Sequence, residues 1–278
     1  MDLLTAPRLY AYTGGRSFDA SKPTIVFLHG AQHDHSVWIL QSRYFAHHGY
    51  SVLAIDLPGH MRSEGPAPTS VEAIAERVVN GLVASGAQRL LLVGHSMGSL
   101  LALEVATRMS ERVVGVALVA AAFPMRVSDA LLDATRGDVP SAMDMINVWS
   151  HSASIAAFER KPSNPGPGFS SVWQNLRLMQ RIARRDGPDV LPIDFAACNS
   201  YAGGLAAAQA LRCPTLFVLG ELDSMTPPRS ARPLIDAMAD AMVVNVPGGG
   251  HSLMAERPDD VLRALVQFAA RVFAPATA

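Results

Sequence analysis

Six short apolar runs constrain the fold of this chain more than any other feature. They lie at residues 24–30, 50–59, 89–98, 113–121, 215–221 and 241–249. Each run is rich in branched apolar residues and is continuous rather than alternating, which is typical of strands buried on both faces. Strands of this kind occur in parallel sheets that helices cover on both sides.

Helical patterns separate these runs. Residues 69–86 place four apolar side chains on one stripe, Thr69 and Glu72 have the spacing of a capping box, and Gly86 suits a left-handed helix end. Further helices are predicted at residues 36–49, 97–109 and 258–273. The alternation predicts an α/β fold: a mostly parallel, doubly wound sheet flanked by helices.

The segment 123–211 interrupts this alternation. It contains no convincing strand, carries methionines and aromatic residues, and has a proline–glycine break at 161–170. We interpret it as an inserted helical cap that covers the site, and residues 1–122 and 212–278 as the core domain. The alternative is a helical decoration without a role in binding.

Composition excludes several classes of function. Charged residues make up 17% of the 278 residues, the net charge is −1, and no basic stripe appears, so nucleic acid is not an expected partner. Two cysteines fit neither a disulfide framework nor a metal site, and Cys213 is expected to be a small buried apolar residue. With no signal peptide and no run long enough to span a membrane, we expect a cytoplasmic protein without a membrane partner.

The segment VGHSMGS (93–99) has the pattern of a sharp strand-to-helix turn that carries a reactive serine. A sharp turn from a strand into a helix forces strained backbone angles on the residue at the corner, and close approach there favours glycine on either side. Gly94 and Gly98 therefore explain how Ser96 can project its hydroxyl above the sheet at a helix N-terminus. The alternative is an ordinary glycine-rich turn.

A serine hydroxyl needs a base within hydrogen-bond reach. Of nine histidines, His251 has the best position, because it follows a strand through three glycines and can lie over the same edge as Ser96. His95 is too close along the backbone to reach that hydroxyl and is expected to pack or bond locally. Four others are expected at the surface: His47, His48, His60 and His151.

The base needs a carboxylate, and the intermediate needs N–H donors. Asp223 lies just past a strand end and is preferred to Glu221, although it also suits an Asx-type turn. The backbone N–H groups of Met97 and of Ala31, in the loop that leaves the first strand, are the expected donors. The alternative for that loop is a simple turn at the strand end.

Five segments carry a resemblance to a known family. LHGAQHDHSVW, AIDLPGHMRSEG, VGHSMGSL, LGELDSMTPP and GGGHSLMAERP resemble, in type, order and spacing, the landmarks of α/β-hydrolases with a helical cap. The resemblance implies Ser96 as nucleophile, His251 as base, Asp223 as its partner, and Ala31 and Met97 as the oxyanion hole. HGAQ has a single glycine, unlike many lipases, and a serine nucleophile argues against the haloalkane dehalogenases and epoxide hydrolases.

The expected reaction is acyl transfer from a carboxylic ester to water, with no metal or organic cofactor. The expected substrate is a small, partly hydrophobic molecule. Thioester, lactone or carbon–carbon bond hydrolysis, perhydrolysis, and a small-ligand receptor without turnover stay as alternatives, and the oligomeric state is left open. Candidate substrate contacts are His33, His35, His95, Trp149, Tyr201 and Asn199.

Overall fold

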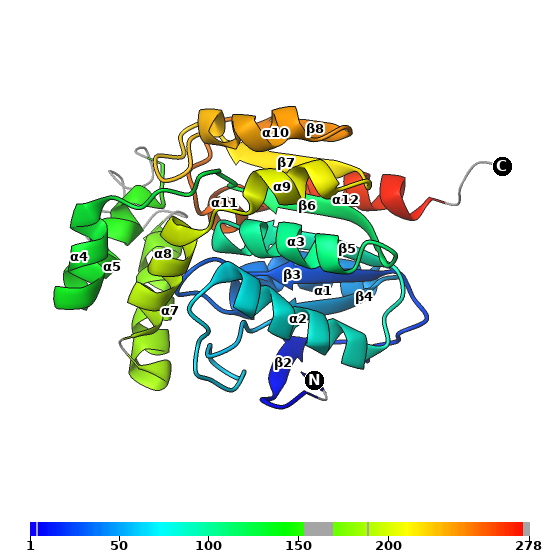
Figure 1. Ribbon diagram of the computed structural model, residues 1–278, viewed down its shortest axis with the longest axis horizontal. Coiled ribbons are helices and arrows are strands. Elements are labelled where there is room, and N and C mark those ends of the chain that lie inside the picture. Colours follow the sequence, from blue (N-terminus) through cyan, green and yellow to red (C-terminus); the bar gives the residue numbers. More distant parts are fainter. Residues whose placement is uncertain (4, 153–168, 188, 275–278) are drawn as a thin grey trace.

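The computed structural model describes residues 1–3, 5–152, 169–187 and 189–274. These residues form an eight-stranded sheet of order β1-β2-β4-β3-β5-β6-β7-β8 (Figure 1). The strands are β1 (Asp2–Leu3), β2 (Leu9–Tyr12), β3 (Thr24–Leu28), β4 (Ser51–Ile55), β5 (Leu90–His95), β6 (Val113–Val119), β7 (Thr215–Gly220) and β8 (Ala241–Val246).

The six predicted runs are the parallel strands β3 to β8, so the fold prediction is confirmed. The antiparallel edge strands β1 and β2 were not predicted. In β2, Leu9 and Ala11 are buried while Tyr10 and Tyr12 are only partly covered. Such an alternation over four residues is too short to stand out from a loop.

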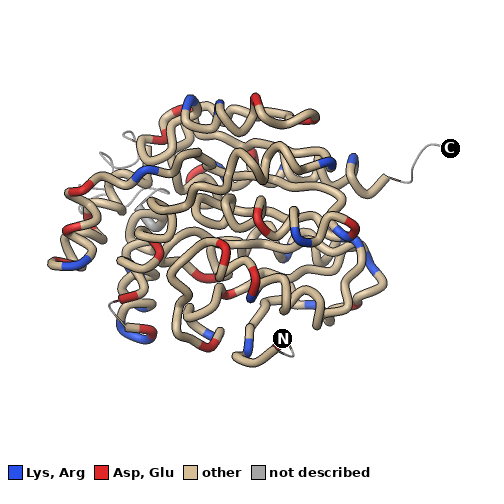
Figure 2. Tube along the Cα trace, viewed as in Figure 1, with Lys and Arg blue, Asp and Glu red and all other residues tan. Residues whose placement is uncertain are grey.

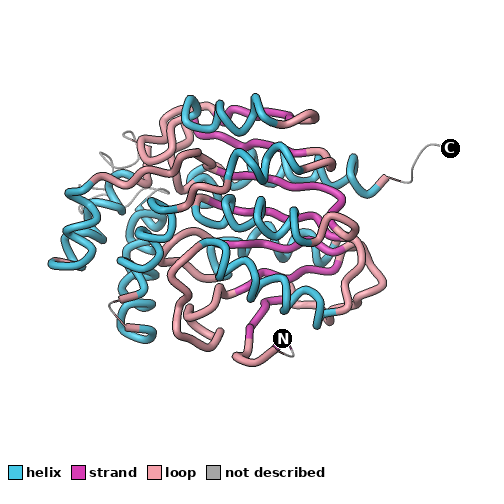
Figure 3. The backbone as a smooth tube through the Cα atoms, in the orientation of Figure 1, coloured by secondary structure: helices cyan, strands magenta, loops and turns pink. Residues whose placement is uncertain are grey.

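Helices cover both faces of the sheet (Figures 1 and 3). One layer shares its core with α2 (Val71–Ser85), α3 (Met97–Arg108), α9 (Gly204–Ala210) and α10 (Arg232–Ala237). The other face packs against α1 (Ile39–His47) and α12 (Pro258–Phe273). Short helical turns complete the core: η1 (His35–Trp38), η2 (Pro228–Ala231) and α11 (Leu253–Glu256). All four predicted helices are therefore present.

Helix α2 confirms the predicted apolar stripe and helix end but corrects the predicted capping residue. Its predicted stripe of apolar side chains is buried, and Gly86 ends the helix with φ 77°. The capping residue, however, is Ser70 and not Thr69, because Ser70 has the extended backbone and its Oγ accepts the N–H of Ala73 at 3.2 Å. Thr69 and Ser70 both suit the sequence pattern of a capping residue, and only the backbone conformation shows which of them caps the helix.

The segment between β6 and β7 contains helices and no strand in its described part. It contains α4 (Asp129–Gly137), α5 (Val139–Trp149), α7 (Phe169–Asp186), α8 (Val190–Ser200) and α9. Helices α4, α5, α7 and α8 share a small core of their own and lie beyond the carboxyl ends of the parallel strands, whereas α9 packs on α3 (Figure 1). Residues 161–168 of the predicted proline–glycine break lie outside the described residues. A cap role for the segment stays a prediction.

Charged residues lie mainly on the outer helices and loops, and the sheet carries few (Figure 2). None of the described helices combines the length and the apolar content that a membrane-spanning helix needs. Both cysteines are free: Cys198 is buried in α8, whereas Cys213 is only partly buried against the core, so its prediction holds in part.

Candidate active site

Ser96 occupies the corner between β5 and α3. Its φ of 52° and ψ of −119° are strained for a residue with a side chain, and its N–H donates to the carbonyl of Val119 at 3.0 Å. A Cβ on Gly94 would lie 2.0 Å from the carbonyl oxygen of Gly98, and one on Gly98 would lie 2.3 Å from that of Leu28. Backbone contacts therefore require both glycines, as the sequence predicted.

The loop that follows β3 passes directly over this corner. A Cβ on Gly30 would lie 3.2 Å from the Cβ of Ser96 and 3.0 Å from Nδ1 of His95. The next residue is Ala31, whose N–H donates to no acceptor within the described part of the chain. Met97 begins α3, so its N–H belongs to the unpaired first turn of that helix. Both proposed donors thus flank Ser96.

Asp223 and His251 meet above the same edge of the sheet. Oδ2 of Asp223, just past β7, lies 2.9 Å from Nδ1 of His251, which follows β8. The other oxygen of Asp223 accepts the backbone N–H groups of Met225 at 2.9 Å and of Thr226 at 2.8 Å. The Asx-type turn and the histidine partner are therefore both present, one on each oxygen. Glu221, the weaker candidate, is exposed.

Thr226 is a member of this cluster that the sequence analysis did not identify. Its Oγ1 lies 2.7 Å from Oδ2 of Asp223, 3.0 Å from Nδ1 of His251 and 3.0 Å from the carbonyl oxygen of Ala120. Burial alone would raise the pKa of Asp223, but the charge of His251 and these hydrogen bonds lower it to about 2. Asp223 is therefore a carboxylate. The position of Thr226 in the same short loop was the only available signal.

His95 joins the two halves of the site. Its Nε2 donates to the backbone carbonyl of His251 at 3.0 Å, and the two rings lie 4.9 Å apart. Because His95 directly precedes Ser96, this bond holds the His251 loop beside the serine corner. Burial, with the nearby His251 and His33, lowers the pKa of His95 well below its ordinary value, so the ring is neutral. The sequence analysis expected His95 to pack or bond locally, whereas its ring bonds to a residue 156 positions later.

Two of the other histidines correct the sequence analysis. His60 and His151 are buried, with 1% and 3% of their surface exposed, although both were expected at the surface. Nε2 of His60 lies 2.9 Å from Asp194, and Nδ1 of His151 lies 2.8 Å from the carbonyl oxygen of Asn147. The inserted segment supplies Asp194 and Asn147, and it covers both rings. His47 and His48 are exposed, as predicted.

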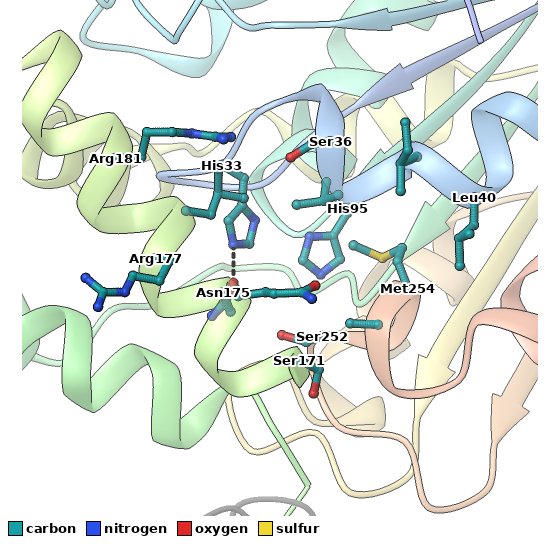
Figure 4. A pocket seen from close by; sticks show the side chains of 15 residues that line it. His33, Ser36, Leu40, His95, Ser171, Asn175, Arg177, Arg181, Ser252 and Met254 are labelled. Atoms are coloured by element: carbon teal, nitrogen blue, oxygen red, sulfur yellow. Dashed lines mark hydrogen bonds between the residues drawn. The ribbon is translucent and has the colours of Figure 1, made fainter. Parts of the chain in front are cut away.

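A cavity of about 540 Å³ opens beside His95 (Figure 4). It lies between helix α7 on one side and η1, α1 and α11 on the other. Its apolar lining consists of Val37, Ile39, Leu40, Leu178, Met254 and Ala255. His95 and Ser252, the chain neighbours of Ser96 and His251, line it as well. The cavity therefore adjoins the cluster described above.

His33 contributes the polar contact that spans this cavity. Its Nε2 lies 2.9 Å from Oδ1 of Asn175 in α7, and its ring stacks on that of His95 with centroids 6.1 Å apart (Figure 4). Burial lowers the pKa of His33 to about 4, against a smaller opposing effect of the bond to Asn175. His33 is thus a neutral hydrogen-bonding group. Asn175 was not predicted, because nothing in a helical stretch marks one polar residue among several.

The other predicted substrate contacts lie elsewhere. His35 bonds to Asp56 at 2.6 Å and packs between two tyrosine rings, and the hydroxyl of Tyr201 donates to Glu104. Trp149 is 37% exposed, and Asn199 accepts the N–H of Val127. None of these four lines the cavity. His35, Tyr201 and Asn199 instead bond to other parts of the protein, and Trp149 is exposed.

One group of carboxylates and histidine has the spacing of a metal site. The ligand atoms of Asp34, His35 and Asp56 lie within 4.8 Å of one another. Asp56 already accepts two bonds from His35, and Asp34 accepts from Ser36 and from the Arg181 guanidinium at 2.7 Å. A neighbouring cation and occupied oxygens fit a hydrogen-bonded network better than a cation site.

Comparison with known proteins identifies the family of this chain. A profile described as the Alpha/beta hydrolase family matches residues 25–264. Pimeloyl-[acyl-carrier protein] methyl ester esterases of Chromobacterium violaceum and Yersinia pseudotuberculosis are 24% and 27% identical, and the alignments cover 88% and 94% of this chain and 93% and 97% of theirs. The enol-lactonase from Burkholderia xenovorans LB400 superposes with a TM-score of 0.78 at 23% identity, over 95% of this chain and 97% of that one. The chain belongs to the alpha/beta hydrolase family and is a hydrolase.

Proposed function

We propose that the protein is a serine esterase that cleaves a carboxylic ester of a small, partly hydrophobic substrate through Ser96, His251 and Asp223. The observation that supports this most strongly is the buried pair of Asp223 and His251, held beside the strained serine corner by the bond from His95. The relatives named esterases act on esters, which agrees with the proposal. A cytoplasmic location stays a prediction from the sequence.

The roles follow from the protonation that the contacts impose. Asp223 is a carboxylate, so Nδ1 of His251 carries the proton that it donates to Oδ2. The opposite nitrogen, Nε2, then has a free lone pair to take the proton of Ser96 as its oxygen attacks the ester carbonyl. His251 gives that proton to the leaving alcohol. Water hydrolyses the acyl-enzyme by the reverse proton path.

The oxyanion of the tetrahedral intermediate would lie between the loop after β3 and the start of α3. The N–H of Ala31 and the N–H of Met97 flank Ser96, and the N-terminus of α3 favours negative charge at this point. Backbone donors cost no reorganisation when the charge forms, because the fold already holds them. We therefore assign the oxyanion hole to these two groups.

The cavity beside His95 is the proposed site for the hydrophobic part of the substrate. Its apolar lining suits an alkyl or aryl group, and His33 with Asn175 provides a polar point in its wall. Helix α7 of the inserted segment forms one wall, which supports the cap role of residues 123–211. His33 and His95 remain proposed substrate contacts.

Relatives that act on an ester of a carrier-bound acyl group suggest a second substrate class. The observation that favours it is a shallow hollow on α7 lined by Arg181, Arg184 and Arg185, at the end of the helix where Figure 2 shows basic residues. A carrier with negative charge on its surface would meet these cations beside the cavity, since Arg181 lines both the cavity and the hollow. Replacing Arg184 and Arg185 together by alanine should then raise KM for a carrier-bound ester by roughly threefold to tenfold, and leave KM for the free methyl ester unchanged. Arg136→Ala in α4 is the control, and equal effects on both substrates would exclude this class.

Ser96→Ala tests the main proposal, with nitrophenyl esters of increasing acyl length as substrates. We expect turnover to fall by about 1,000,000-fold while the substrate still binds. Ser85→Ala in α2 is the matched control, since that hydroxyl also belongs to a helix and donates to a backbone carbonyl at 2.7 Å, but away from the corner. Unchanged turnover in Ser96→Ala would refute the assignment. Faster cleavage of thioesters, lactones or carbon–carbon bonds, or faster perhydrolysis, would leave the catalytic residues as assigned and change only the substrate class. Tight binding of a ligand without turnover would indicate a receptor.

A further inference from the structure

Two inserted helices hold the loop that carries Ala31. The next residue, Gln32, is buried and has a left-handed backbone with φ 55°. Its N–H donates to Oδ2 of Asp194 in α8 at 2.8 Å, and its side-chain amide donates to the carbonyl of Met179 in α7 at 3.1 Å. The loop is thus tied to the insertion through both its backbone and its side chain.

Asp194 is bound from a second direction by His60. Nε2 of His60 lies 2.9 Å from the same Oδ2, and its Nδ1 lies 3.2 Å from the carbonyl oxygen of Pro58. A carbonyl oxygen and a carboxylate oxygen both accept, so both ring nitrogens are placed to donate. Burial alone would lower the pKa of His60, but the Asp194 carboxylate raises it above the ordinary value, so the contacts and the pKa both favour the imidazolium. Asp194 is 0% exposed and His60 is 1% exposed. The backbone of Gln32 therefore donates to a buried, charge-paired carboxylate.

Backbone strain makes this contact important for the direction of the neighbouring peptides. A residue with a side chain pays about 1 kcal/mol or more to stay left-handed, so Gln32 needs an anchor at its N–H. Without one, Gln32 would relax to an ordinary backbone, and the peptides on either side would rotate. The N–H of Ala31 lies in the peptide that joins residues 30 and 31, directly before the peptide that carries the N–H of Gln32. Rotation of the second peptide would therefore change the direction of the Ala31 N–H as well.

We propose that Asp194 is a positioning residue: from the inserted segment, it fixes the N–H of Ala31 in the oxyanion hole through the backbone of Gln32. This inference rests on the proposed function of Ser96 and Ala31. Asp194 has no exposed surface and does not line the cavity, so its effect would reach the reaction through the loop. The inserted segment then contributes to catalysis as well as to the wall of the cavity.

The position of an oxyanion donor matters within a few tenths of an ångström, because a donor contributes fully only at about 2.7–3.1 Å from the developing charge. Loss of a whole donor typically lowers kcat by roughly 100-fold to 1,000-fold. A donor that is still present but no longer held should cost less. Substrate binding in the ground state should change little, because the carbonyl makes weaker bonds there than the oxyanion does.

The test compares three variants of the full chain on the ester that it cleaves best. Asp194→Ala should lower kcat by roughly tenfold to 100-fold and change KM by less than about twofold. Asp194→Asn keeps an acceptor oxygen at the same place and should recover most of that loss. Leu191→Ala, on the same buried face of α8, should lower Tm by at least as much as Asp194→Ala and leave kcat unchanged.

A trifluoromethyl ketone provides a second readout, since its adduct with a serine places an oxyanion in the hole. Its inhibition constant should rise in Asp194→Ala by the factor by which kcat/KM falls. Should Asp194→Ala fail to fold, Gln32→Met removes the second tether and should lower kcat in the same direction, by a smaller factor. Retained kcat/KM and ketone affinity in either variant, with a loss of Tm like that of Leu191→Ala, would overturn the inference. Failure of the proposed function appears differently, as full turnover in Ser96→Ala.

Discussion

The serine corner and the cavity wall lie at the same edge of the sheet but are specified in different ways. At the corner, backbone atoms of neighbouring elements come so close that only glycine fits at positions 94 and 98. In the wall, α7 contributes side chains such as Asn175, whose role depends on His33 far away in the sequence. Geometry imposed by the backbone leaves a pattern in the sequence, whereas geometry imposed by distant side chains leaves almost none.

After the loss of Ser96 itself, removing the charge of Asp223 should have the largest effect on activity. Asp223→Asn keeps the shape of the side chain but no longer favours the tautomer of His251 that leaves Nε2 free, so we expect kcat to fall by about 10,000-fold. Glu221→Gln, two residues earlier and exposed, is the matched control and should keep full activity. Steady-state kinetics on one ester checks both. Comparable losses in the two variants would mean that the carboxylate was wrongly assigned.

A methyl group at the corner should have the largest effect on stability. Gly94→Ala would place a Cβ 2.0 Å from a backbone oxygen, so we expect a loss of about 3 kcal/mol or more in the free energy of unfolding. Gly137→Ala at the end of α4 meets no atom within 4 Å and should change that free energy by less than about 1 kcal/mol. Chemical denaturation measures both. If Gly94→Ala leaves the free energy of unfolding nearly unchanged, the geometry of the corner is not imposed by backbone contacts, and the contrast with the cavity wall fails.

Filling the cavity should alter substrate preference rather than stability. Leu178→Trp adds volume to the wall formed by α7, so we expect kcat/KM for long acyl chains to fall by about tenfold relative to short ones. Leu205→Trp, at an exposed position in α9, adds the same ring away from the cavity. Profiles over acyl length compare the two variants. If both profiles match the wild type, the acyl group binds elsewhere.

The smallest expected effect is a pH dependence of stability from the buried pair that joins the core to the insertion. Burial alone would lower the pKa of His60, but the carboxylate of Asp194, its hydrogen bond and the more distant Asp186 raise it above the ordinary value, although the His29 ring packs beside it. Its contribution is therefore complete below the unfolded pKa, near 6.5, and is lost as pH rises through the folded pKa.

His60→Gln removes this titration. Between pH 6 and pH 9 the free energy of unfolding of the wild type should therefore fall more than that of His60→Gln, as measured by denaturant titration at each pH. His48→Gln, at an exposed position, should follow the wild type. Parallel pH profiles for His60→Gln and the wild type would show that the imidazolium does not form.

The parts of the molecule that could be predicted are those set by local pattern. Continuous apolar runs identified the six parallel strands, and glycine spacing identified the corner at Ser96. Asp223 could be preferred to Glu221 from its distance past the strand end alone. The strand β2, second from the edge of the sheet, was missed because four residues carry too little periodicity.

What could not be predicted depends on the inserted segment. His60 was expected at the surface because its partner Asp194 lies 134 positions later and nothing near His60 signals burial. His35 was expected near the substrate because it lies in the loop after the first predicted strand, and Tyr201 because it lies near the return from the insertion to the sheet. Buried carboxylates at Asp56 and Glu104 bind them elsewhere. Thr226 and Asn175 are common polar residues whose roles appear only once the partners are in place.

The central claim is that the hydroxyl of Ser96 is the reacting nucleophile. Its most direct test is the site of covalent labelling by a fluorophosphonate, located by mass spectrometry of the digested protein. We predict one phosphonyl group per chain, attached to Ser96, and no label in Ser96→Ala. A label on any other residue, or an active esterase that takes up no label, would contradict the claim.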